Sequence, residues 1–137
     1  MNITIKQALL AAALLGLTAL LRAEPTLVGN QSFAGQTLDA DGIKAVLLGK
    51  KVMLGDTRVV IVVAKSSAGQ DAFLQAHAGM TTSQFQNYWR RLFMTGGGSA
   101  PKIVETEAEA VKLVAETSGA LAAADSASAG GLVVLAK

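Results

Sequence analysis

Apolar residues recur along the chain with two different periods, which predict its strands and its helices. Residues 58–64, RVVIVVA, form a continuous run of mainly β-branched side chains, which is typical of a strand buried on both faces. Shorter apolar segments at 26–29 (TLVG), 119–125 (GALAAAD) and 131–137 (GLVVLAK) are also expected to be strands.

The segments between these strands have the spacing and the capping residues of helices. Asp39 can cap a helix that stops at Gly49, and either Thr81 or Thr82 can cap a later one. Thr106 and Glu109 give the capping-box pattern T-x-x-E. The expected helices cover residues 40–48, 70–78, 83–94 and 107–117. Because strands and helices alternate, the predicted fold class is α/β with a mixed or mostly parallel sheet flanked by helices.

Aromatic and basic residues adjoin in NYWRRLFM, a combination that also occurs in nucleic-acid-binding proteins. Helical spacing instead places Phe85, Trp89, Leu92 and Phe93 on one apolar stripe, with the two arginines outside or beside it. The stripe favours a core-facing helix over a nucleic-acid platform.

The first 23 residues are expected to be a signal peptide, and residues 24–137 a single domain. Lys6 precedes an apolar stretch of signal-peptide length, ALLAAALLGLTALL, which is followed by the small residue Ala23. The alternative is an uncleaved N-terminal membrane anchor. Either interpretation predicts an exported protein, with the bacterial periplasm as its expected location.

Cleavage before Glu24 removes Lys6 and Arg22, which leaves ten basic against ten acidic residues. Nucleic acid is therefore not an expected partner, because that binding needs an excess of positive charge. The chain has no cysteine and one histidine, His77, so no metal site, cofactor or enzymatic activity is expected.

The segment KSSAGQDAF, residues 65–73, has the chemistry of an anion cradle. It lies between a predicted strand and a predicted helix, where backbone N–H groups and the helix dipole favour an oxyanion. Ser66 and Ser67 can add hydroxyl donors, Lys65 a positive charge, and Gly69 and Gln70 backbone donors. The alternative is that Ser67 only caps the helix.

Two further polar residues, Asn30 and Ser32, follow the first predicted strand. They can meet the same ligand if that strand is parallel and adjacent to residues 58–64, since the carboxyl ends of parallel strands share one edge of a sheet.

These segments, taken in order, resemble the small periplasmic phosphate-binding-like proteins, relatives of the substrate-binding subunit of phosphate ABC transporters. YWRRLFMTGGGSAP carries the most specific part of the resemblance, and the whole spans residues 26–125. The family has a turn with the sequence Gly-Ser-Gly-Thr-Arg. Ser67 matches the serine of this turn, and Ala68, Gly69 and Gln70 stand where the family has glycine, threonine and arginine. The other matching segments are Leu47-Leu48-Gly49-Lys50, Ser67 to Phe73 and Ser118-Gly119-Ala120-Leu121.

The resemblance implies one lobe of a type 2 periplasmic-binding-protein-like fold that binds phosphate or a similar oxyanion reversibly. It also implies an ABC permease or another envelope protein as a partner, and a homodimer can rebuild the cleft that a second lobe would supply. The missing threonine and arginine favour a different function, that of a structural or protein-partner-binding module which kept the fold without the ligand. Both hypotheses remain open from the sequence.

Overall fold

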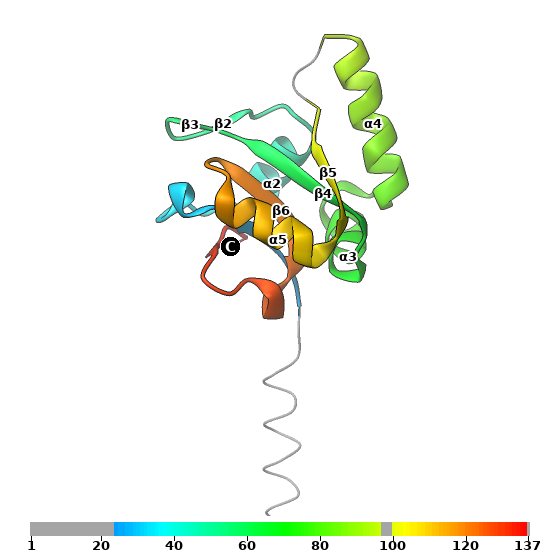
Figure 1. Ribbon diagram of the computed structural model, residues 1–137. Coiled ribbons are helices and arrows are strands. Elements are labelled where there is room, and N and C mark those ends of the chain that lie inside the picture. Colours follow the sequence, from blue (N-terminus) through cyan, green and yellow to red (C-terminus); the bar gives the residue numbers. More distant parts are fainter. Residues whose placement is uncertain (1–23, 97–99, 137) are drawn as a thin grey trace, which may run out of the picture.

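A computed structural model describes residues 24–96 and 100–136 of the chain (Figure 1). The expected signal peptide lies outside these described residues. Within them, no helix combines the length and the apolar character that crossing a membrane requires.

A five-stranded mixed sheet, with strand order β5-β4-β6-β1-β7, forms the centre of the fold. β4 (Val60–Ser66) runs parallel to both β5 (Lys102–Thr106) and β6 (Ala120–Asp125). β1 (Pro25–Gly29) runs antiparallel to β6 and to the short β7 (Val133–Val134). The predicted α/β class with a mixed sheet is confirmed, although the last strand is much shorter than expected.

The predicted strand 58–64 divides into two parts. Its first residue belongs to a separate hairpin of β2 (Met53–Leu54) and β3 (Thr57–Arg58), and β4 begins only at Val60. Short 3-10 helices, η1 (Gln31–Phe33) and η2 (Ser126–Ser128), follow β1 and β6.

The α-helices within the described residues are α2 (Ala40–Leu47), α3 (Ala68–Ala78), α4 (Thr82–Met94) and α5 (Glu107–Glu116). Side-chain caps fix where they start, because each cap oxygen accepts a hydrogen bond from a backbone N–H of the first turn. Thr81, not Thr82, caps α4 in a full capping box with Gln84. α3 starts two residues earlier than predicted because Ser67 is its cap.

β4 is buried on both faces, as its sequence predicts. Ile61 and Val63 pack in one core with residues of α2, α3 and α4, whereas Val62 and Ala64 pack with Ala110 and Val114 of α5 on the opposite face. Figure 1 shows α5 in front of the sheet and α2 behind it. The sheet is therefore the middle layer of three.

The apolar stripe of α4 is buried only in part. Phe85 and Trp89 lie in the core, and the Trp89 indole Nε1 donates a 3.0 Å hydrogen bond to the Leu47 carbonyl. Leu92 is half-buried, and Phe93 is 54% exposed, so the prediction that Phe93 faces the core is wrong. Phe85 and Trp89 are therefore the part of the stripe that the core covers, with Leu92 packed at its margin.

Gly119, at the entry to β6, is required by both its backbone conformation and its surroundings. Its φ is +78°, and an added Cβ would lie 2.1 Å from the carbonyl oxygen of Arg58. Gly119→Ala is expected to lower the free energy of unfolding by about 3 kcal/mol or more, since strain and overlap add.

Gly35→Ala is the matched control, because Gly35 has φ +83° with no heavy atom within 4 Å of an added Cβ. Its expected cost is about 1–2 kcal/mol of backbone strain alone. Urea denaturation of both variants measures the difference, and equal losses would contradict the close contact at Gly119.

Candidate functional site

Ser67 holds the start of α3 and is itself buried. Its hydroxyl oxygen accepts a 3.1 Å hydrogen bond from the backbone N–H of Gln70, so Ser67 does cap the helix. The same hydroxyl donates its proton to Oε1 of Glu107 at 2.7 Å. The single hydrogen-bond donor of the Ser67 side chain is therefore already engaged by a carboxylate of the same chain.

Two carboxylates of the protein crowd the first turn of α3. The Glu107 carboxylate also accepts hydrogen bonds from the Ser128 hydroxyl at 2.8 Å and from the backbone N–H of Asp125 at 3.3 Å. Oδ1 of Asp125 lies 2.6 Å from the position that a Cβ on Gly69 would take. The absence of a side chain at Gly69 thus makes room for a carboxylate, and the negative charge that the helix dipole favours is already present.

Lys65 is paired as well. Its ammonium lies 2.7 Å from Oε1 of Glu105 on the neighbouring strand, and both side chains are more than half exposed. The hydrogen bond to Glu105, and then the attraction of its charge, raise the pKa of Lys65 above its usual value. Ser66, at the end of β4, has an exposed side chain.

Gln70 has a structural role that its position in the sequence did not indicate. Its side chain is 2% exposed; Oε1 accepts from the backbone N–H of Ala64 at 2.8 Å, and Nε2 donates to the Ala64 carbonyl at 2.7 Å. Nε2 also donates to the Thr82 hydroxyl at 3.1 Å. The amide ties β4, α3 and the start of α4 together.

Asn30 and Ser32 lie at the other end of the sheet. Sharing a ligand with Ser67 required a parallel, adjacent first strand, but β1 is antiparallel and β6 separates it from β4. The Asn30 amide donates to the carbonyls of Val114 and Ala115 at the end of α5, and the Ser32 hydroxyl accepts from the backbone N–H of Gly119. The structure does not bring these two residues to the α3 site.

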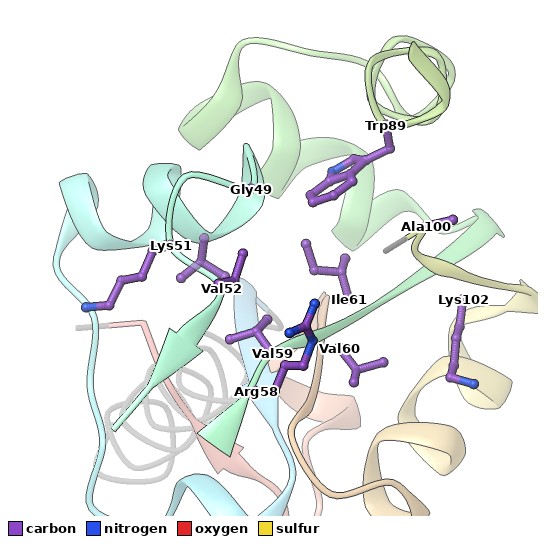
Figure 2. A pocket seen from close by; sticks show the side chains of 11 residues that line it. Gly49, Lys51, Val52, Arg58, Val59, Val60, Ile61, Trp89, Ala100 and Lys102 are labelled. Atoms are coloured by element: carbon purple, nitrogen blue, oxygen red, sulfur yellow. The ribbon is translucent and has the colours of Figure 1, made fainter. Parts of the chain in front are cut away.

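A hollow at the amino end of β4 was not predicted. It has a volume of about 340 Å³ and lies between the β2–β3 hairpin, the start of β4 and Trp89 of α4 (Figure 2). Its lining includes Lys51, Arg58 and Lys102 but no carboxylate. These residues are far apart in the sequence, and no spacing pattern links them.

His77, in the last turn of α3, is one of the residues lining a separate hollow of about 350 Å³. Its ring lies 4.3 Å from that of Phe73, centroid to centroid. Across residues 24–96 and 100–136, no group of three or more histidine, aspartate or glutamate side chains can hold a metal ion.

Comparison with known proteins supports the fold and leaves the ligand open. No protein-family model matches the chain, and no curated protein is significantly similar to it in sequence. Among solved structures, an ABC-type phosphate transport receptor from Vibrio cholerae matches with a TM-score of 0.60 and 13% sequence identity. The match covers 82% of this chain but only 45% of the receptor chain. The chain thus has a periplasmic-binding-protein-like fold and spans less than half of that receptor.

The role of Gln70 can be tested by removing its polar groups at nearly constant size. Gln70→Leu leaves the buried N–H and carbonyl of Ala64 without this partner, and is expected to lower the free energy of unfolding by about 2–4 kcal/mol. Gln75→Leu, at an exposed position of the same helix, is expected to change it by less than about 0.5 kcal/mol. Thermal or urea unfolding followed by circular dichroism measures both; similar stabilities would show that Gln70 does not hold β4.

Proposed function

We propose that this chain is an exported, non-catalytic binding module built on one solute-binding-protein-like lobe, in which the oxyanion site at α3 is closed. The observation that carries the proposal is the 2.7 Å hydrogen bond from the Ser67 hydroxyl to Glu107. The serine best placed to bind phosphate binds an internal carboxylate instead.

Electrostatics favours the closed state over bound phosphate. An anion at Ser67 has to displace the Glu107 carboxylate and then lie beside both Glu107 and Asp125. Two like unit charges 4 Å apart repel by about 4 kcal/mol at an effective dielectric constant of about 20. A hydrogen bond to a charged group contributes only about 1.5–3 kcal/mol of stabilisation. The repulsion therefore outweighs each hydrogen bond that phosphate would gain.

Catalysis is not favoured by the groups around Ser67. Its hydrogen-bond acceptor is a carboxylate, and the single histidine of the chain lies in the last turn of α3, far from the first. The structurally similar protein from Vibrio cholerae is a transport receptor rather than an enzyme. Export to the periplasm is supported by the receptor-like fold and by the signal-peptide pattern of residues 1–23.

Reversible phosphate binding at α3 is the second candidate function. The structural similarity to a phosphate receptor favours it, and Ser67, Gly69 and Gln70 do follow the parallel strand β4, which ends with Lys65 and Ser66. In this form the module would deliver phosphate to an ABC permease or another envelope protein. The two candidates differ in whether Glu107 leaves Ser67 when phosphate is present.

Calorimetric titration of phosphate into residues 24–137 at low ionic strength distinguishes the two candidates. We expect no saturable heat up to millimolar phosphate, because the carboxylates repel the anion. Replacing both of them, with Glu107→Gln and Asp125→Asn together, is expected to produce weak saturable binding, because the isosteric amides remove the repulsion.

The matched control replaces two acidic residues away from Ser67, with Glu116→Gln and Asp56→Asn, and is expected to leave phosphate unbound. Circular dichroism establishes that each variant is folded. Phosphate-selective binding by the unmodified protein, lost in Ser67→Ala, would contradict the closed site and establish the second candidate.

A further inference from the structure

We propose that the hollow beside Trp89 binds a small amphipathic anion, a carboxylate carried on an aliphatic or aromatic body. The proposal rests on the proposed function in one respect, since it assigns a ligand to the binding module. It places that ligand at the amino end of β4, whereas the α3 site lies at the carboxyl end.

The hollow has the size of a small-molecule site and a fixed wall. Its volume of about 340 Å³ falls within the range of about 300–1,000 Å³ that is usual for ligand pockets. The Trp89 indole is held by its hydrogen bond to the Leu47 carbonyl, and its ring lies 2.8 Å from where a Cβ on Gly49 would be. The tryptophan is therefore positioned before any ligand arrives.

The charged residues at the hollow are all basic. Figure 2 shows the Arg58 guanidinium directed toward the space below Ile61 and Trp89, while the ammonium groups of Lys51 and Lys102 point outward at the rim. In the described part of the chain, no carboxylate lies within salt-bridge distance of Arg58. An arginine fork can bind a carboxylate with two parallel hydrogen bonds, so Arg58 is the expected partner of the anionic head.

The rest of the lining is apolar and needs an apolar ligand body. Val52 is 46% exposed although its side chain faces the hollow, and Val59 and Ile61 continue the surface toward Trp89. A second hollow of about 170 Å³ adjoins the first through Trp89 and Ala100, and reaches the exposed side chains of Phe93 and Ile103. Inorganic phosphate has no apolar group that could pack against these surfaces, whereas the body of an alkyl or aryl carboxylate covers them.

The experiment uses Trp89 as its own reporter, because it is the single tryptophan of the chain. Octanoate is titrated into residues 24–137, which contain every described helix and strand, and tryptophan fluorescence is recorded. We expect a saturable change with octanoate, at least tenfold weaker binding of octan-1-ol, which lacks the charge, and no response to acetate, which lacks the apolar body.

Two pairs of variants locate the site. Arg58→Gln is expected to weaken octanoate binding about tenfold, whereas Arg91→Gln, the same change at an exposed position of α4 outside both hollows, leaves it unchanged. Val52→Asp is expected to abolish binding, and Val134→Asp, the same change at a similarly exposed position outside both hollows, to preserve it. All four positions are exposed, so folding is not at risk.

Equal binding of octanoate and octan-1-ol, binding unaffected by Arg58→Gln, or no saturable change at all would overturn the proposal. Its failure is distinct from failure of the proposed function. The phosphate titration concerns Ser67 and Glu107, and phosphate binding there would leave the octanoate results unchanged.

Discussion

Residues Ile61 to Ala64 of β4 are buried from both sides, and the layers of the molecule depend on this burial. A strand without a polar face cannot lie at a surface, so helices must cover the sheet on both sides. Its carboxyl end meets the first turn of α3 at Ser67, with Gln70 bonded to both main-chain polar groups of Ala64. The turn that resembles an anion-binding loop therefore has a structural role, because it connects a buried strand to the helix that covers it.

Features that depend on neighbouring residues are readable from the sequence. The caps at Asp39, Ser67 and Thr106 each bond a backbone N–H three positions ahead, and the double burial of β4 follows from an uninterrupted apolar run. The hydrogen bonds that decide the α3 site are of another kind. Ser67 and Glu107 are separated by 40 positions, as are Lys65 and Glu105, and only the parallel alignment of β4 and β5 brings them together.

Strand direction was the second feature that the sequence did not determine. The four residues TLVG suit a parallel and an antiparallel strand equally, and the choice sends Asn30 to opposite ends of the sheet. The hollow could not be predicted from the sequence for a related reason. Arg58, Trp89 and Lys102 come from three elements, and a charge at the mouth of a pocket has the same sequence signature as a charge on any exposed turn.

The two ends of β4 differ in charge, although residues 24–137 together contain ten basic and ten acidic side chains. The carboxyl end gathers Glu105, Glu107 and Asp125 around Lys65 and Ser67, whereas the hollow near the amino end is lined by basic and apolar residues. The first turn of α3 already carries two carboxylates of its own chain, Glu107 and Asp125, which satisfy the helix dipole. At the opposite end, Lys51, Arg58 and Lys102 take part in no salt bridge among the described residues, so an anion there is attracted rather than repelled. The fold alone does not distinguish the two ends of β4, and the distribution of charge is what separates them.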